Sequence, residues 1–190
     1  MLRRQWSPRW SAPECDNTAF GEAANASNVS ALGNSTFGSQ ALTNNTGDGN
    51  DACGYHAMSN NAVGISNNAH GANALLSNTT GSNNAAFGNG ALQNNGTASG
   101  NNAFGALALQ ANTIGESNNA HGSSALQDNT TGDENNAFGN NALLANISGA
   151  RNNAFGTSAL QANTTGTANI SYGHQALRTL VNIISTFGCS

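Results

Sequence analysis

The chain of 190 residues contains no lysine and only five arginines, and charged residues make up 7% of it. A soluble domain typically has about 25% charged residues. Because the formal net charge is also negative, at −4, the sequence offers no basic surface that could contact phosphate groups. We therefore expect no binding to nucleic acid.

Long hydrophobic runs are also missing. No stretch approaches the ~18 consecutive apolar residues of a membrane-spanning helix, so we expect no insertion into a membrane. Residues 1–16 carry Arg3 and Arg4 near their start, but no apolar segment follows, and we recognise no signal peptide. The same residues hold both tryptophans and both prolines of the chain, which indicates a leader or linker.

The abundant residues are asparagine, with 34 copies, and glycine, with 23, and they recur with a fixed period. An alanine follows one particular glycine by three residues in all ten units, and leucine comes next in eight of them. An asparagine lies seven residues after this glycine in nine units. Disordered segments usually lack such regular apolar positions. The numbers of these marker glycines rise in steps of 17, with a single step of 16: Gly21, Gly38, Gly54, Gly71, Gly88, Gly105, Gly122, Gly139, Gly156 and Gly173.

The period predicts an all-β fold, a parallel β-solenoid of about ten coils. A unit of about 17 residues is too short for a helical hairpin repeat, which needs about 33, and its glycine and asparagine content opposes helix formation. Segments such as 103–105 (AFG) and 108–112 (ALQAN) have strand length and are separated by turn residues. We expect two or three such strands per coil, with coils ~4.8 Å apart.

Each repeated position has an expected role. The residue before the marker glycine, phenylalanine in six units, and the repeated leucine are expected to point inward as two apolar ladders. The marker glycine is expected to provide a positive φ or room for a close backbone approach at a corner. The recurrent asparagine is expected to bond turn backbone and its own copies in neighbouring coils.

The segments 17–24 (NTAFGEAA), 152–166 (NNAFGTSALQANTTG) and 170–177 (ISYGHQAL) resemble the NTAxGxxAL repeats of bacterial and phage surface fibres. They are also similar to the shorter repeats in the heads of trimeric autotransporter adhesins. The resemblance covers residues 17–177. It implies a fibrous, often trimeric, surface-exposed protein that binds a host surface or matrix.

Cysteine and histidine show no arrangement that predicts chemistry. Cys15, Cys53 and Cys189 lack the spacing of a metal site, and Cys53 and Cys189 would lie about eight coils apart, too far for a disulfide. Cys53 takes the phenylalanine position and is expected to be a small buried residue. His70 and His121 take the same position three coils apart, roughly 14 Å, so they cannot share a metal ion.

The acidic residues Asp48, Asp51, Asp133 and Glu134 are expected to be solvated turn residues without a calcium-binding motif. No serine, histidine and aspartate set or carboxylate pair recurs, so we expect no enzyme and no catalytic, cofactor or metal site. Three pairs beginning at Thr79, Thr130 and Thr164 raise the alternative of ice binding, although other residues interrupt the register.

Ten sequons of the type Asn-X-Ser/Thr are candidate glycosylation sites in a secretory context. Six of them fall on the repeated asparagine position, where turn chemistry already explains the residue. The ten are Asn25, Asn28, Asn34, Asn44, Asn78, Asn95, Asn129, Asn146, Asn163 and Asn169.

The sequence therefore predicts three parts: a leader or linker (1–16), a β-solenoid domain (17–177) and a tail that caps the last coil or contacts a partner (178–190). We expect a non-enzymatic structural or adhesive module of an extracellular or surface-exposed fibre, which acts as rigid spacer and binding surface. Its expected partners are further copies of the chain, as a trimer or filament, and a host-surface or matrix ligand. The alternatives are a glycosylated matrix or filament protein and an ice-binding protein.

Overall fold

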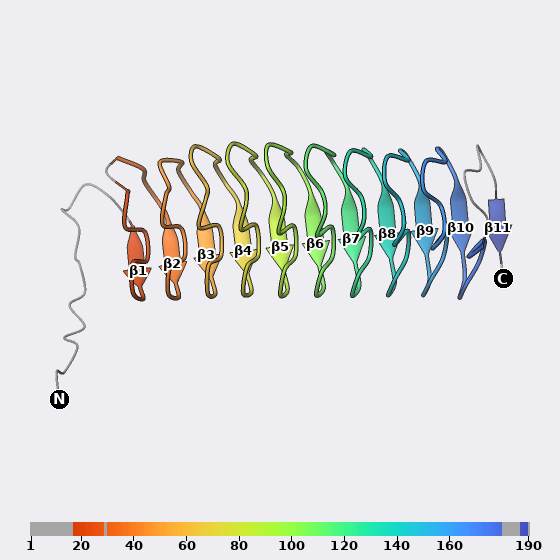
Figure 1. The fold of residues 1–190 in the computed structure, drawn as a ribbon, viewed down its shortest axis with the longest axis horizontal. Helices are drawn as coiled ribbons and strands as arrows, with labels where there is room; N and C mark the ends of the chain where they lie inside the picture. Colours follow the sequence, from red (N-terminus) through yellow and green to blue (C-terminus); the bar gives the residue numbers. More distant parts are fainter. Residues whose placement is uncertain (1–16, 29, 180–186, 190) are drawn as a thin grey trace, which may run out of the picture.

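The computed structural model describes residues 17–28, 30–179 and 187–189, and the predicted leader (1–16) lies outside them. The described chain forms eleven strands of three residues each, which line up side by side along a rod (Figure 1). The strands are β1 (Thr18–Phe20), β2 (Ser35–Phe37), β3 (Asp51–Cys53), β4 (Asn68–His70), β5 (Ala85–Phe87), β6 (Asn102–Phe104), β7 (Asn119–His121), β8 (Asn136–Phe138), β9 (Asn153–Phe155), β10 (Ile170–Tyr172) and β11 (Phe187–Cys189).

The strands form one parallel sheet in chain order, so each strand pairs with the strands of the coils before and after it. The register follows the period of the sequence: Phe87 lies opposite Phe104, and Phe104 lies opposite His121. Each coil is thus one repeat unit, closed by a turn-rich return path. This arrangement confirms the predicted parallel β-solenoid with one sequence repeat per coil.

The number of strands per coil differs from the prediction, because each described coil has one strand and the ALQAN segments are turns. The reason lies in the backbone of the repeated leucine. Leu109, the repeated leucine of this coil, has φ 52°, and Leu107 two residues before it has φ 60°. Both values lie in the left-handed region, which a strand cannot contain. That conformation costs roughly 1–2 kcal/mol. Complete burial of Leu109 contributes about 1.5–3 kcal/mol and offsets the cost.

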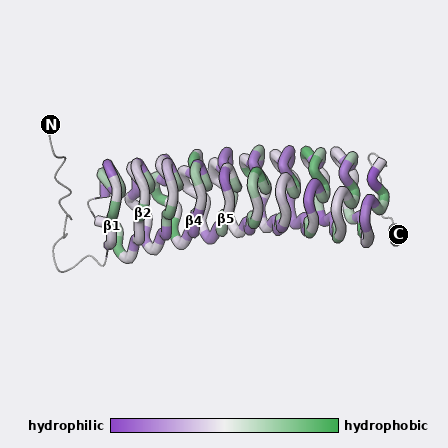
Figure 2. Tube along the Cα trace, turned by 90° about the horizontal axis from the view of Figure 1, so that it is seen from below, coloured by the Kyte–Doolittle hydropathy of each residue, from purple (hydrophilic) through white to green (hydrophobic). Residues whose placement is uncertain are grey.

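The core is a narrow column built from three repeated positions. The leucines from Leu42 to Leu160, with Met58 in their place in one coil, are fully buried, as are the alanines directly before them, and Leu177 is partly buried. The third position is the middle residue of strands β2 to β10, such as Ala103 in β6 and Ala120 in β7. Hydrophobic and hydrophilic residues therefore alternate around every coil of the tube (Figure 2).

The predicted inward direction of the phenylalanine position is wrong, and so is the predicted burial of Cys53. Successive side chains of a strand point to opposite faces, and Ala103 in the middle of β6 takes the inward face. Phe104 therefore points outward, and it is 39% exposed. Cys53, at the same position in β3, is also exposed.

The marker glycines occupy a corner that excludes other residues for two reasons. All ten have φ between 123° and 144°, where residues with a side chain are strained. A Cβ atom added to Gly105 would also lie 2.5 Å from the carbonyl oxygen of Gly122 in the next coil. Positive φ and close backbone approach thus both apply at this position.

The C-terminal part continues the sheet although the sequence motif ends at Leu177. Strand β11 pairs in parallel with β10, and Cys189 lies opposite Tyr172, again one full repeat away. Residues 180–186 and 190, which belong to the predicted tail, lie outside the described residues. In the part of the chain that the structure describes, no helix has the length and apolar character needed to cross a membrane.

Candidate functional site

Two ladders of buried asparagine side chains run the length of the rod. The turn-side amide ladder is formed by the asparagine seven residues after the marker glycine, from Asn45 to Asn163. Asn112 donates from Nδ2 to Oδ1 of Asn95 in the coil before (2.9 Å) and to the carbonyl of Gly115 in its own turn (2.9 Å). The same pattern recurs along the fully buried members Asn45, Asn61, Asn78, Asn95, Asn112, Asn129, Asn146 and Asn163.

The strand-side amide ladder comes directly before each strand, and the sequence argument missed it. Asn118 donates from Nδ2 to the Gly132 carbonyl (2.8 Å) and to Oδ1 of Asn101 (3.2 Å), which also accepts the backbone N–H of Asn118 (2.9 Å). The Gly132 carbonyl accepts from Asn129 of the turn-side ladder as well (3.0 Å). One carbonyl per coil therefore joins the two ladders.

The second ladder carried a clear signal in the sequence. An asparagine stands four residues before every marker glycine, in all ten units from Asn17 to Asn169. The position directly after it is often asparagine too. Only the structure separates the two, since Asn118 is buried and Asn119 beside it is half-buried on the outer face.

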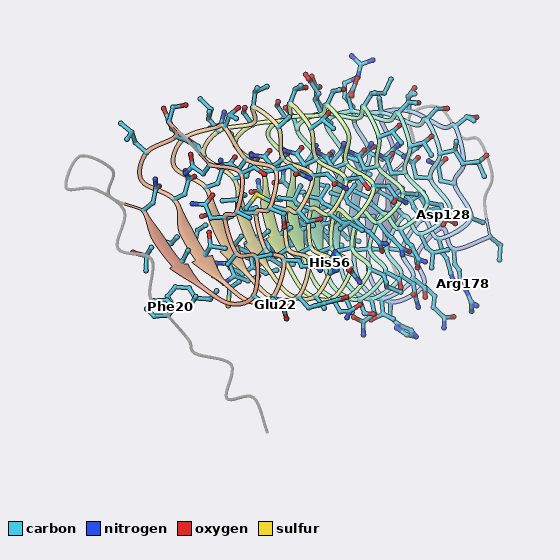
Figure 3. The ribbon with its side chains drawn as sticks, turned by 60° about the vertical axis from the view of Figure 1, so that its left-hand side comes forward. Phe20, Glu22, His56, Asp128 and Arg178 are labelled. Carbon is cyan, nitrogen blue, oxygen red and sulfur yellow. The ribbon has the colours of Figure 1, made fainter. Side chains whose placement is uncertain are left out.

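An outer aromatic ladder runs along the outward face of the sheet. Neighbouring rings from His70 to Tyr172 are stacked with centroids 4.7–4.9 Å apart and interplanar angles of 2–15°. Phe20, which Figure 3 labels on the outer side of β1, stacks on Phe37 at 5.2 Å. The ladder consists of Phe20, Phe37, His70, Phe87, Phe104, His121, Phe138, Phe155 and Tyr172.

Beside these rings lies an outer asparagine row at the first position of four strands. Asn102, Asn119 and Asn136 each donate from Nδ2 to Oδ1 of the asparagine in the next coil, at 2.8–2.9 Å, and the row ends at Asn153. The outward face of the sheet therefore presents a stripe of rings next to a stripe of amides. A surface of this kind can contact apolar and hydrogen-bonding groups of a partner together.

The predicted histidines and acidic residues do not come together into a metal site. In the described ranges no group of three or more His, Cys, Asp or Glu residues could hold a metal ion. His121 is a ring of the ladder, between Phe104 and Phe138. Asp51 lies in β3 and not in a turn, and its Oδ2 is 3.3 Å from Nε2 of His70.

The other predicted acidic residues lie in exposed turns. Asp48 accepts the backbone N–H of Leu32 (2.8 Å), and Asp133 accepts that of Glu116 (2.8 Å). Each bond joins one coil to the next. Glu134 is exposed and has φ 57°.

The threonine pairs face outward from the turns, and their first hydroxyls are already used. Thr79 donates from Oγ1 to the Gly96 carbonyl (2.9 Å), and Thr130 donates in the same way to the carbonyl of Ile147 (3.0 Å). These bonds again join one coil to the next.

The structure divides the ten sequons by burial. Asn44 is exposed, and Asn25 and Asn28 are half-buried. The remaining seven are buried at 0% exposure, most of them as members of the two amide ladders. A glycan on a buried Nδ2 atom would have no space inside the folded coil. The seven are Asn34, Asn78, Asn95, Asn129, Asn146, Asn163 and Asn169.

Comparison of the chain with protein-family models, with curated proteins and with solved structures finds no match.

Proposed function

We propose that the chain is a non-enzymatic module of a surface-exposed fibre, which serves as rigid spacer and presents the outer aromatic ladder as its binding surface. The continuous row of exposed and half-buried rings is the observation that carries the proposal. Single exposed apolar residues are normal on a protein surface, whereas contiguous apolar patches mark interaction sites. Here the rings follow one another in nearly every coil of the rod.

The rigidity of the rod is supported by its interior. Each coil is tied to its neighbours by the parallel sheet, by two amide ladders and by the leucine column. Such repeats contact only adjacent repeats, so their stability adds along one dimension. A rod of this kind holds a binding surface at a distance from its point of attachment.

We propose an extracellular or surface location and association with further copies of the chain, as a trimer or filament. The resemblance of segments such as 152–166 to surface-fibre repeats supports this assignment. The low charge supports it too, because a surface with 7% charged residues keeps an isolated rod poorly soluble. Burial of seven of the ten sequon asparagines makes a heavily glycosylated matrix protein the weaker alternative. A host-surface or matrix ligand would bind to rings of this row that contacts between copies leave uncovered.

Light scattering on the full-length protein at tens of micromolar tests the proposal. Replacement of Phe87, Phe104 and Phe155 by serine should convert an oligomer to monomers, because these substitutions remove ring area from the outer aromatic ladder. The matched control replaces three exposed apolar turn residues by serine in the same way, Val63, Ile114 and Ile147. This variant should remain an oligomer. A wild-type protein that is a stable monomer at these concentrations would remove the oligomeric fibre from consideration.

A further inference from the structure

One rung of the outer aromatic ladder is missing. Cys53 lies opposite Phe37 on one side and opposite His70 on the other, in direct register. Every other described coil from β1 to β10 places a ring at this position. We call the gap between the facing sides of Phe37 and His70, which has Cys53 at its base, the notch.

Phe37 is more exposed than the phenylalanine rings that have a ring on both sides. Phe37 is 45% exposed, whereas Phe87 and Phe104, which have a ring on both sides, are 36% and 39% exposed. The terminal rings Phe20 and Tyr172 reach 53% and 49%. Phe37 thus resembles a ring at the end of a stack, although it lies inside the row.

The notch has the width of one planar ring. The ladder repeats every 4.8 Å, as between His70 and Phe87, so two steps separate the rings of Phe37 and His70 by about 9.6 Å. The stacked rings are nearly parallel, and a centroid distance of 4.8 Å is that of an offset stack in contact. A ring placed midway would repeat this contact on both faces, and a thicker, non-planar group would not fit.

We propose that the notch binds one aromatic side chain of a partner polypeptide, which completes the ladder between Phe37 and His70. The Asp51 carboxylate lies on the same side of β3 as Cys53 and contacts His70. It can accept a hydrogen bond from an indole N–H or a phenol O–H. The notch therefore fits tryptophan or tyrosine better than phenylalanine.

The occupant is a side chain and not a free small molecule, for a reason of area. Two ring faces offer little apolar surface to a free small molecule. Its binding must also offset the translational and rotational entropy that the molecule loses. A ring that belongs to a partner chain gains the rest of its interface from the neighbouring rings and the outer asparagine row. The proposal rests on the proposed function in this one respect, that the outward face of the sheet is a binding surface.

Cys53 provides a direct test that needs no partner, because its thiol lies at the base of the notch. Full-length protein with Cys15→Ser and Cys189→Ser is equilibrated with equal amounts of bis(2-phenylethyl) disulfide and bis(2-cyclohexylethyl) disulfide. The Cys53 thiolate attacks a reagent sulfur and forms the mixed disulfide. The leaving thiolate takes up the proton that the Cys53 thiol gave up. Mass spectrometry gives the ratio of the two adducts.

We expect the phenyl adduct to exceed the cyclohexyl adduct at least about fivefold, since two ring contacts are gained. Phe37→Ala or His70→Ala should bring the ratio close to one. Equal adducts in the parent protein, or a preference that survives Phe37→Ala, would overturn the proposal. The ratio of adducts and the oligomeric state are measured separately, so either proposal can fail while the other stands.

A relocated notch is the matched control. The combined change Cys53→Phe and Phe104→Cys closes the gap in β3 and opens one in β6, between Phe87 and His121. The neighbours are again a phenylalanine and a histidine. The preference for the phenyl reagent should move with the cysteine. If the preference does not move with the cysteine, other residues near β3 cause it, and the proposed binding of a ring in the notch is wrong.

Discussion

The inner amide ladders and the outer aromatic ladder repeat with the same period, yet they differ in what they tolerate. Every unit has asparagine at the strand-side position, from Asn17 to Asn169. The outer position accepts phenylalanine, histidine, tyrosine and, once, Cys53. A buried amide must meet donors and acceptors in both neighbouring coils, and an unsatisfied polar group there costs about 1–3 kcal/mol. An outer ring needs only a flat surface on the neighbouring side chains, against which it can stack.

The largest effect is expected at the marker glycine, which follows the outer ring directly. In Gly105→Val the new Cβ atom would lie 2.5 Å from the Gly122 carbonyl oxygen, at φ 144°. Neither backbone can move without breaking the register of adjacent coils. We expect a loss of about 4 kcal/mol or more in the free energy of unfolding, measured by urea denaturation.

Gly96→Thr is the control for this glycine. Gly96 has no positive φ, and an added Cβ would lie an ordinary 3.6 Å from its nearest neighbour, the carbonyl oxygen of Thr113. Other coils have threonine at this turn position, such as Thr79. The variant should unfold within about 0.5 kcal/mol of the parent. Equal stabilities for the two glycine variants would mean that the corner is ordinary extended backbone.

The adjacent residues Asn118 and Asn119 allow the two environments to be compared one residue apart. Asn118→Ala removes two donated bonds and two accepted bonds inside the rod, and we expect a loss of about 3 kcal/mol. Asn119→Ala removes one bond to each neighbour in the half-buried outer row. Its expected cost is about 0.5–1 kcal/mol.

Amide hydrogen exchange identifies where each change acts. Asn118→Ala should accelerate exchange in the two neighbouring coils, because their ladder bonds open as well. Asn119→Ala should leave exchange of the buried backbone close to that of the parent. Equal destabilisation by both variants would contradict the distinction between inner and outer ladders.

The smallest effect is expected in a turn that already varies in length. The coil after Gly38 is one residue shorter than the others, because only Thr46 separates Asn45 from the turn glycine, Gly47. Asn45 then reaches the Gly47 carbonyl two residues away (2.7 Å). Insertion of a threonine after Thr46 should change the free energy of unfolding by about 0.5 kcal/mol or less, since the turn is exposed.

The same insertion made inside a strand should behave differently. One alanine added between Ala103 and Phe104 would turn the ring inward and an alanine outward, because side chains alternate along a strand. The urea midpoint should fall sharply. A tolerated insertion in β6 would show that the inward and outward faces of the sheet are not fixed.

The period, the parallel stacking and the leucine column could be predicted from the sequence, because ten in-phase glycines and alanines specify one coil per unit. The outward direction of Phe104 could not, since a three-residue strand leaves open which residue faces inward. A signal was present all the same. The residue two before the marker glycine is always small, as Ala103 is, whereas the residue directly before it includes His70 and Cys53. A position that accepts imidazole is suited to solvent.

The left-handed backbone conformation of the repeated leucine could not be predicted from the sequence either. Leucine is uncommon at positive φ, so the ALQAN segment indicated a strand. Only the complete burial of Leu109 and its neighbours shows what offsets the cost. The absence of an aromatic ring at Cys53 was visible in the sequence. Because this position was expected to point inward, however, Cys53 was interpreted as a small core residue.

Within both inner ladders, the hydrogen bonds from one amide side chain to the next all point in one direction. Asn61 donates to Asn45 and Asn118 donates to Asn101, always toward the coil nearer the N-terminus. Their dipoles add, as peptide dipoles do along a helix. Within the described residues, Asn34 is left with an unused buried Nδ2 donor near one end and Asn163 with an unused Oδ1 acceptor near the other. The rod thus has a polarity, and further coils could extend these ladders only head to tail.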